Sequence, residues 1–540
     1  MLTAALLLAP IIQSGGSQGP ALDLQDLLPT AEPELRQAAF AAISQAGEEQ
    51  YLPPLLDLLS LAETPEEWYQ ILDAMSAITG TAQREVDRPW RTNSLRLADT
   101  EDRQLPDGYL AFKRELYASK VSLEFRRFLG SESAPIPNLD EVVLGGVVPS
   151  EIPALDHART VPAGEADFLP DHAPVIGIVL EGEARAYPHR ILDWHELACD
   201  TLGGRRIALS WCTMCGAAIA YDATPTYDSA EDDPEPLTFD TSGLLFRSNK
   251  LMFDTATDSL WNQFTGEAFS GPMAKRGARL TPLAVVHTTF GRWRAEHPET
   301  TVVSPETGYD KDYSEGAAYS EYFASSGTIF PTPRLGRRFA AKERMVVLRH
   351  AGKRLTVPTQ DVGPGGLLHV TLAEQRFVLI DRSPAPKAML NEAWIRALEA
   401  TEGSSVAPTV QHMRDAVNHL GDPPALDLAA VLSLPRATRT ALLEREIAKV
   451  ELTEEVRRNA AIHQLIADIR VFEAGDHTFQ LSEDGQLLDE AGTIWLESPQ
   501  HLESKEDPEV RLKRTPAHFA FGFAVDSADI PTSNRNAKQD

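Results

Sequence analysis

Apolar positions recur every three to four residues near the start of the chain and every two residues further on. The first pattern is typical of amphipathic helices. It extends from residue 29 to residue 80 and includes Leu35, Ala38, Ala39, Ala42 and Ile43. It predicts a helical segment over residues 25–130 that contains a hairpin like one HEAT repeat. Because a single unit of that kind cannot bury its apolar face alone, we expect it to pack against other parts of the chain.

Beyond a connector expected over residues 130–153, the period of two predicts β-strands. The segments Val175–Leu180 and Ala184–Tyr187 flank a turn at Gly182, which predicts a hairpin. Further strands are predicted at Arg206–Ser210, at Ala217–Tyr221 and within Leu237–Phe253. We therefore expect an α+β protein with a strand-rich first core copy over residues 150–340.

This core contains a weak internal repeat. Four of its positions recur 170 residues later, in the pairs Val175 and Met345, Gly182 and Gly352, Pro188 and Pro358, and Arg206 and Arg376. Three further pairs have a longer offset: Thr238 and Thr478, Phe239 and Phe479, and Trp261 and Trp495. A fixed period is the signature of a repeat architecture. We predict a degenerate second core copy over residues 341–530, with a helical insertion at about residues 391–470.

Several polar residues receive structural interpretations. His287 and His297 are expected in a helix near Trp293, and His518 matches His287 in the repeat, which suggests packing roles. Asp254 and Trp261 are predicted to form a strand, a turn and an aromatic anchor, together with the residues Ser259, Leu260, Thr265, Gly266 and Glu267.

Size and charge restrict the partners of the chain. With 540 residues it is long enough for several domains, and a hydrophobic content of 43% is ordinary for a soluble protein. Lys and Arg total 50 against 79 Asp and Glu, which gives a net charge of -29. A field of that sign repels phosphate backbones and anionic membrane surfaces, so we expect no nucleic-acid partner.

The first residues resemble a secretory signal peptide. An apolar run at residues 4–9 is followed by small residues, although the basic residues that normally precede such a run are missing. We expect a signal peptide over residues 1–20 and a periplasmic or extracellular protein, with a buried N-terminal helix as the alternative. No later segment has 18 continuous apolar residues, so no membrane span is predicted.

Two of the three cysteines, Cys212 and Cys215, are separated by only two residues. That spacing allows two thiolates to bind one metal ion, or one disulfide to open and close. In the repeat, His195, Glu196, Cys212 and Cys215 correspond to Gly365, Gly366, Arg382 and Ala385. If the repeat is real, these four side chains form one site that only the first copy carries.

The first hypothesis for this site is a metal centre formed by His195, Cys212 and Cys215. Two Cys and one His with an open fourth position are typical of catalytic zinc, and soft sulfur ligands also suit Cu(I). Glu196 is then a further ligand, a partner of a ligand or a catalytic general base.

The alternatives are a redox pair and a structural one. Cys212 and Cys215 can exchange between thiols and a disulfide, with Cys199 as a third ligand or resolving thiol. No βαβ pattern typical of thioredoxin follows the pair, which weakens this reading. In a binding or scaffold module the pair would only stiffen a turn. An aromatic and acidic loop is a candidate pocket wall, with the residues Tyr309, Asp312, Tyr313, Tyr322 and Phe323.

The chain resembles the bacterial and archaeal family of domain of unknown function 3179. The resemblance is clear over residues 152–333 and fainter to 527. It rests on Ala184 to Pro188, Trp194 to Glu196, Cys212 to Gly216, Ser242 to Leu245, Ser259 to Trp261, Thr265 to Ala268 and Thr307 to Tyr309. Where the family usually has Pro and Leu between the cysteines, this chain has Thr213 and Met214, and both sulfurs are kept. The resemblance implies an often exported, soluble protein and implies no reaction.

Overall fold

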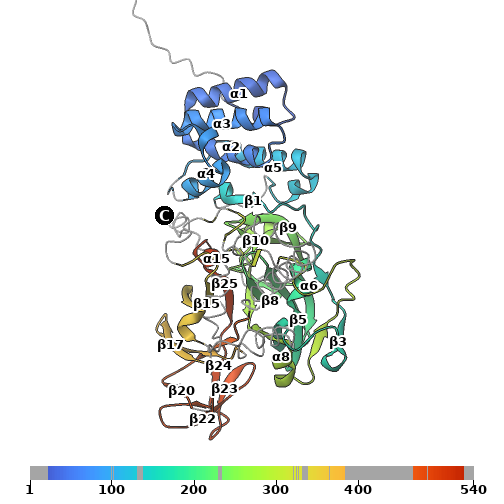
Figure 1. Cartoon of the computed structure of the whole chain (residues 1–540), viewed down its shortest axis with the longest axis vertical. Coiled ribbons are helices and arrows are strands. Elements are labelled where there is room, and N and C mark those ends of the chain that lie inside the picture. The colour runs from blue at the N-terminus through green and yellow to red at the C-terminus, as the bar shows by residue number, and fades with distance from the viewer. Residues whose placement is uncertain are drawn as a thin grey trace, which may run out of the picture. The chain divides into compact units, whose positions relative to one another are not determined.

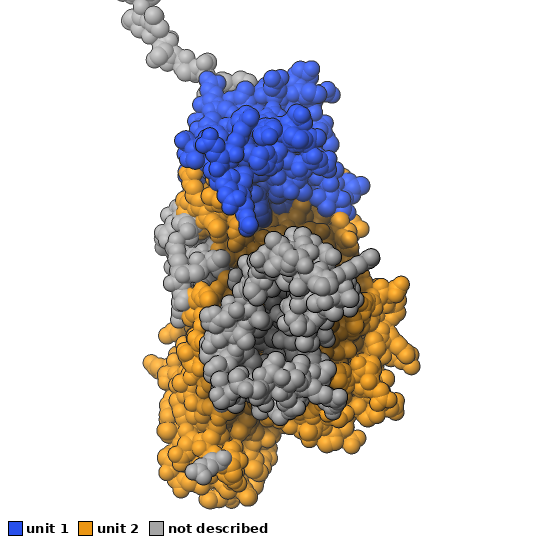
Figure 2. Space-filling model, viewed as in Figure 1, with its two compact units in different colours: residues 1–90, 103–123 blue, residues 91–102, 124–540 orange. Residues whose placement is uncertain are grey.

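The fold combines helices and strands, as predicted from the sequence (Figure 1). The computed structural model describes residues 22–98, 100, 103–130, 138–228, 234–319, 322–323, 325, 327–330, 332, 339–363, 365–383, 466–482 and 484–527. They form two compact units, one from residues 1–90 and 103–123 and the other from residues 91–102 and 124–540 (Figure 2). No helix within the described ranges is long and apolar enough to cross a membrane. The predicted signal peptide lies outside those ranges.

The first unit is helical. Its helices begin and end at residues that favour these positions. Before the helix Pro65–Thr79, the Thr64 side chain accepts a hydrogen bond from the Glu67 amide, and Pro65 is the first helical residue. Gly80 ends the same helix in the left-handed region at φ +67°. The helices are α1 (Pro33–Ala46), α2 (Leu52–Ser60), α3 (Pro65–Thr79) and α5 (Tyr109–Lys120), with α4 (Pro89–Ala98) across the boundary. The likeness to a HEAT repeat stays a prediction.

In the second unit, residues 138–303 contain the predicted strands together with further ones, and these strands form three sheets. Their orders are β1-β9-β10-β11, β12-β8-β7-β6-β2 and β13-β4-β5-β14-β3. Among them are the shorter strands β1 (Val142–Leu144), β2 (Leu155–Asp156), β3 (Thr160–Pro162), β12 (Arg279–Leu283) and β14 (Thr301–Val303). The strands that build the candidate site and its surroundings are β4 (Pro174–Leu180), β5 (Glu183–Pro188), β6 (Leu197–Leu202), β7 (Arg205–Cys212), β8 (Ala217–Thr226), β9 (Phe239–Phe246), β10 (Asn249–Asp254), β11 (Leu260–Asn262) and β13 (Val286–Thr289).

Two predictions about these residues are wrong. His287 lies in strand β13, where its backbone pairs with Ile176, and only His297 adjoins the helix α8 (Phe290–Glu296). The apolar and β-branched neighbours of His287 explain the strand, because they suit a sheet buried between layers. The connector contains the strand β1 (Val142–Leu144), which pairs with β9 and so adds a strand to that sheet.

Residues 341–527 repeat part of this arrangement. Their sheets run β16-β15-β25 and β17-β18-β19, as β5-β4-β13 and β6-β7-β8 do in the first half. The strands are β15 (Arg344–His350), β16 (Lys353–Pro358), β17 (Leu367–Leu372), β18 (Gln375–Asp381), β19 (Ile469–Glu473), β22 (Ile494–Glu497), β24 (Arg511–Lys513) and β25 (Ala517–Phe521). The predicted helical insertion lies outside the described residues, except for its end, where β19 begins.

Side-chain contacts also recur between the halves. Arg206 donates to the Thr238 hydroxyl at 3.2 Å, and Arg376 donates to the Thr478 hydroxyl at 3.2 Å. The Trp261 indole donates to Asp254 at 2.9 Å, and the Trp495 indole donates to Asp489 at 3.0 Å. Duplication stays a prediction, and these paired contacts favour it.

The strand pairing shifts one predicted correspondence. His287 faces Ile176 in β4, whereas His518 faces Val347, and Phe519 faces Val346 in β15. Since Ile176 corresponds to Val346, the residue that answers His287 is Phe519. A slip of one residue moves a side chain to the other face of a strand, so the register decides this where the sequence alignment does not.

Candidate functional site

The Cys212–Cys215 turn is built at the end of a buried strand. Strand β7 ends at Cys212, and the Cys215 amide donates to the Cys212 carbonyl at 3.1 Å, which closes the turn. The two cysteines form a disulfide with their Cα atoms 5.2 Å apart. Gly216 completes the turn at φ +57°, and a Cβ there would lie 2.9 Å from the Phe521 ring. Glycine is therefore required at this position by both conformation and space.

Cys199 does not belong to this turn. It lies in β6 opposite Ala208, four residues from Cys212 along β7, which corresponds to about 13 Å of extended strand. Its Sγ accepts from the Phe239 amide at 3.3 Å, and burial raises the pKa of the thiol to about 12. A buried thiol of such high pKa is a poor nucleophile. The structure therefore does not bring Cys199 to the disulfide.

His195 holds a loop in place. Its Nδ1 lies 2.8 Å from the Pro153 carbonyl, and its Nε2 lies 2.6 Å from the Tyr313 hydroxyl. A carbonyl only accepts, so Nδ1 carries the proton and the neutral ring accepts from Tyr313 at Nε2. Burial lowers the pKa of His195, which agrees with a neutral ring. Thr307 extends this series of hydrogen bonds, because its hydroxyl lies 2.6 Å from the Tyr313 hydroxyl.

The aromatic and acidic loop, predicted as a pocket wall, lies beside the candidate residues. The Tyr309 ring is 5.2 Å from the His195 ring, and the Asp312 carbonyl accepts from the Trp194 indole at 2.7 Å. Further on, the Tyr322 hydroxyl donates to the Met214 carbonyl at 2.7 Å, between the two cysteines. The loop is therefore fixed to the helix α6 (His189–His195) and also touches the turn that carries the disulfide.

Glu196 is paired with a lysine in the interior. It ends α6 in the left-handed region at φ +56°. Its Oε2 lies 3.7 Å from Lys250 Nζ, and its Oε1 accepts from the Tyr319 hydroxyl at 3.5 Å. Lys250 Nζ also donates to the Glu196 carbonyl and, at 3.0 Å, to the Trp211 carbonyl. The lysine thus links Glu196 to the residue that precedes Cys212.

Burial shifts the proton affinities of these groups. Burial raises the pKa of Glu196, and the charge of Lys250 only partly opposes that rise. Burial lowers the pKa of Lys250 to about 8 against the opposing effect of Glu196. The Thr213 hydroxyl, between the cysteines, is near enough to lower the pKa of Glu196, although no partner among the described residues meets it in hydrogen-bond geometry. Such shifts are typical of groups that exchange protons near neutral pH.

A second carboxyl lies in the same region. Asp193 accepts from the Trp211 indole at 2.8 Å. Burial raises its pKa to about 8 despite that hydrogen bond, and the charge of Glu196 adds to the rise. Two buried acids therefore sit at the end of α6, each with an elevated pKa.

The sequence interpretation missed Lys250, Asp193 and Tyr319. Lys250 had a weak signal, since it is a single charge in front of the apolar run Leu251–Phe253 and directly after a tight turn. A buried strand with one lysine needs a partner for that charge. Asp193 and Tyr319 had no distinctive spacing, and only the fold brings them to the site.

The described residues do not fit the predicted metal centre in this conformation. Both sulfurs are joined to each other, and both His195 nitrogens have hydrogen-bond partners. No group of three or more His, Cys, Asp or Glu side chains within the described ranges is placed to hold a metal ion. Zinc or copper binding, and the ligand roles of His195, Cys212 and Cys215, stay predictions for the reduced protein.

Comparison with known proteins gives one result. A family model described as "Protein of unknown function (DUF3179)" matches residues 149–527, which include both halves of the strand-rich core. No curated protein and no solved structure matches the chain. The matched range includes Cys212, Cys215, His195, Glu196 and Lys250. The chain therefore belongs to the DUF3179 family.

Proposed function

We propose that Cys212 and Cys215 form a thiol–disulfide redox centre that is served by the buried Glu196–Lys250 pair. The observation that carries this proposal is the disulfide beside two charged groups whose pKa values are shifted by burial. A purely structural role is less attractive, because closing so short a loop stabilises a fold by only about 2 kcal/mol. Burying Lys250 and Glu196 is costly, which favours a use for them.

The proposed reaction is an exchange with a dithiol. One thiol of the partner loses its proton, and the thiolate attacks Cys212 Sγ, since Cys212 keeps 2% exposure and Cys215 has none. The bond between the two cysteines breaks, and Cys215 leaves as a thiolate that takes up a proton. The second thiolate of the partner then attacks the partner's own sulfur in the mixed disulfide. Cys212 is released and protonated, and the partner ends as a disulfide, having given up two electrons and two protons.

Glu196 and Lys250 supply and accept protons in this exchange. A carboxyl with a raised pKa holds its proton closer to neutral pH, so it can donate to a leaving thiolate. The Lys250 ammonium, whose pKa is lowered to about 8, can then replace the proton that the Glu196 carboxyl has lost. Because Lys250 also binds the Trp211 carbonyl, the proton-carrying groups are attached to the strand that ends at Cys212.

The test is thiol counting in the folded protein. Native chain is treated with dithiothreitol at pH 7, blocked with a maleimide and weighed by mass spectrometry. We expect two labels, on Cys212 and Cys215, and none on Cys199 until the chain is unfolded. A disulfide that is reduced only at the denaturant concentration that unfolds the chain would show that the pair is structural.

Matched variants separate the roles. Cys212→Ser should abolish labelling that depends on the reductant, whereas Cys199→Ser should leave it unchanged. Glu196→Gln should slow reduction and move its pH dependence, while Glu306→Gln, at an exposed ion pair with Arg159, should not. Equal pH profiles for wild type and Glu196→Gln would remove the proton-transfer role.

Export is part of the same proposal. Disulfides persist in oxidising compartments, and the predicted signal peptide over residues 1–20 would direct the chain to one. Mass spectrometry of the protein from a cell fractionation tests it, with removal of the first residues and a periplasmic or extracellular location as the expected result. An intact N-terminus in the cytosolic fraction would contradict export.

A further inference from the structure

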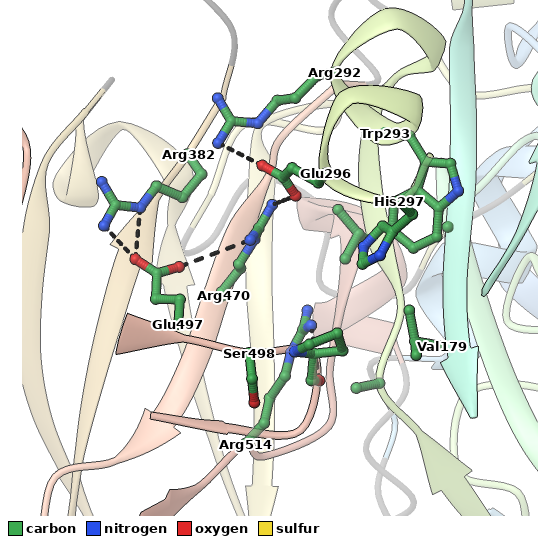
Figure 3. A pocket seen from close by; sticks show the side chains of 14 residues that line it. Val179, Arg292, Trp293, Glu296, His297, Arg382, Arg470, Glu497, Ser498 and Arg514 are labelled. Carbon is green, nitrogen blue, oxygen red and sulfur yellow. Dashed lines mark hydrogen bonds and ion pairs between the residues drawn. The ribbon is translucent and has the colours of Figure 1, made fainter. Parts of the chain in front are cut away.

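A polar pocket lies where the two halves of the strand-rich core meet (Figure 3). Its volume is about 340 Å³, within the range of small-ligand sites. Helix α8 forms one side, and the other sides come from residues in or next to β4 and β13 of the first half and β18, β19, β22 and β24 of the second. Four arginines line it, namely Arg292, Arg382, Arg470 and Arg514. The pocket shares no residue with the Cys212–Cys215 site.

Three of these arginines are neutralised by carboxylates. Arg470 lies 2.7 Å from Glu296, 2.9 Å from the buried Asp468 and 3.7 Å from Glu497. Arg292 pairs with Glu296 at 2.9 Å and with Asp468 at 3.3 Å. Arg382 pairs with Glu497 (Figure 3). Three guanidinium groups and three carboxylates therefore form one network without net charge.

Arg514 is the additional cation. It is 9% exposed, and among the described residues its guanidinium donates only to carbonyls, to Pro499 at 3.2 Å and to Val285 at 3.4 Å. No carboxylate in the described part of the chain lies within ion-pair distance of it. Burial, together with the charge of Arg470, lowers its pKa to about 10, and the carboxylates of Asp468, Glu497 and Glu296, which lie beyond ion-pair distance, oppose that shift only in part. A buried charge without a counter-ion is costly, and an anion in the pocket would relieve that cost.

The opposite wall of the pocket is apolar. Val179, Val286 and Trp293 line it, and the Trp293 indole is fixed by a hydrogen bond to Thr300 at 2.9 Å. Burial lowers the pKa of His297, whose ring lies 4.2 Å from the Trp293 ring, so it adds no positive charge at neutral pH. Within the described residues, the pocket thus offers one arginine without an ion pair, Arg514, and an apolar surface facing it (Figure 3).

We propose that this pocket binds a small organic monocarboxylate with an apolar body, whose carboxylate pairs with Arg514. A guanidinium donates two parallel hydrogen bonds to a carboxylate, which fits this anion better than a point charge would. A dianion such as phosphate would leave one negative charge unmatched in a buried site. The apolar body would lie against Val179, Val286 and Trp293.

Benzoate is the probe, since it combines one carboxylate with a flat apolar ring. The full chain is titrated with benzoate at pH 7 and low salt by calorimetry, and the rise in Tm is measured in parallel. We expect saturable binding that is tighter than that of acetate, which lacks the apolar body, and than that of inorganic phosphate. Arg514→Gln should weaken benzoate binding roughly ten- to a hundredfold, because a charged hydrogen-bonding partner is lost.

Arg511→Gln is the matched control. Arg511 lies in β24, three residues before Arg514, and it pairs with Glu503 with 56% of its side chain exposed. The substitution changes the net charge by the same amount, so general electrostatics would affect both variants equally. We expect the affinity of Arg511→Gln for benzoate to stay within about twofold of wild type.

A second variant covers the case in which Arg514→Gln does not fold. Ala284→Phe places a ring into the pocket and keeps every arginine, so it should also abolish benzoate binding. No heat and no change in Tm with benzoate in the wild type would overturn the proposal. So would equal affinities of wild type and Ala284→Phe, equal losses in the two arginine variants, or tighter binding of phosphate than of benzoate.

Discussion

The two halves of the strand-rich core share strand order and yet carry different side chains at the same place. In the first half β7 ends at Cys212, in the disulfide turn. In the second half β18 ends at Asp381, and the residue that corresponds to Cys212 is Arg382. Arg382 pairs with Glu497 in the arginine pocket. Similar strands thus end in a disulfide in one half and in a charged network in the other.

This difference separates the scaffold from the site. The paired contacts Arg206–Thr238 and Arg376–Thr478 hold equivalent strands together in both halves. Glu196, by contrast, corresponds to Gly366, and neither the buried lysine nor the disulfide has a counterpart at the matching described positions. Contacts that recur maintain the fold, whereas side chains found in one half are candidates for function.

The largest expected effect tests whether the recurring contacts are equivalent. Asp254→Ala removes the acceptor for the Trp261 indole and for Thr257, and Asp489→Ala removes the acceptor for the Trp495 indole, Ala491 and Thr493. Each change leaves a buried indole donor unsatisfied and also removes hydrogen bonds to backbone amides, so each should lower the free energy of unfolding by about 3–4 kcal/mol. Denaturant unfolding measures both. A loss in one half without a similar loss in the other would break the parallel.

The next effect contrasts two turn glycines. Gly216→Ala meets both an unfavourable φ and the Phe521 ring, whereas at Gly485, with φ +79°, an added Cβ has nothing within 4 Å. We expect a destabilisation of about 2–3 kcal/mol for Gly216→Ala and about 1 kcal/mol for Gly485→Ala. Thermal unfolding of both variants checks this. Equal losses would mean that the packing of Phe521 on the disulfide turn contributes nothing.

A smaller effect depends on pH. It is confined to the first half, because the residue of the second half that corresponds to Asp193 is Gly363, which does not titrate. The pKa of Asp193 is raised to about 8 in the folded chain, so folding favours its protonated form. That stabilisation is complete below the ordinary carboxyl pKa and is lost as the pH rises through about 8. Asp193→Asn, which keeps an acceptor for Trp211, should therefore be more stable than wild type at pH 8 and similar to it at pH 4. Parallel stability curves of the two proteins between pH 4 and 8 would contradict the shift.

The smallest effect concerns access to the disulfide. Tyr322→Phe removes the hydrogen bond to the Met214 carbonyl and keeps the ring, which weakens the contact of the aromatic loop by about 1 kcal/mol. We expect dithiothreitol to reduce the native disulfide roughly fivefold faster. Tyr227→Phe, whose hydroxyl contacts Met273 away from the turn, is the control. An unchanged rate in Tyr322→Phe would mean that this contact does not limit access.

Much of this arrangement could be predicted from local patterns. The period of two predicted the β4–β5 hairpin, and the aromatic loop with Tyr309 and Tyr313 was predicted as a candidate pocket wall, without a place next to His195. His287 was assigned to a helix because its neighbours Trp293 and His297 lie in or next to one, while its own pairing partner, Ile176, is more than 100 residues away in the chain. Long-range pairing of this kind overrides local spacing.

The sequence alone determined the strand-rich α+β class and the closeness of Cys212 to Cys215, because alternation and short spacing are local properties. Its motifs also indicated membership of the DUF3179 family. Only the tertiary structure decided that both His195 nitrogens bind to Pro153 and Tyr313, that Lys250 meets Glu196, and that Arg514 is buried without a carboxylate partner among the described residues. Each of these contacts joins segments that are distant in sequence. Whether a charged side chain has a counter-ion is therefore settled only when the fold places its neighbours. Burial then sets the proton affinities, because the low dielectric of the interior acts only on groups that the fold has enclosed.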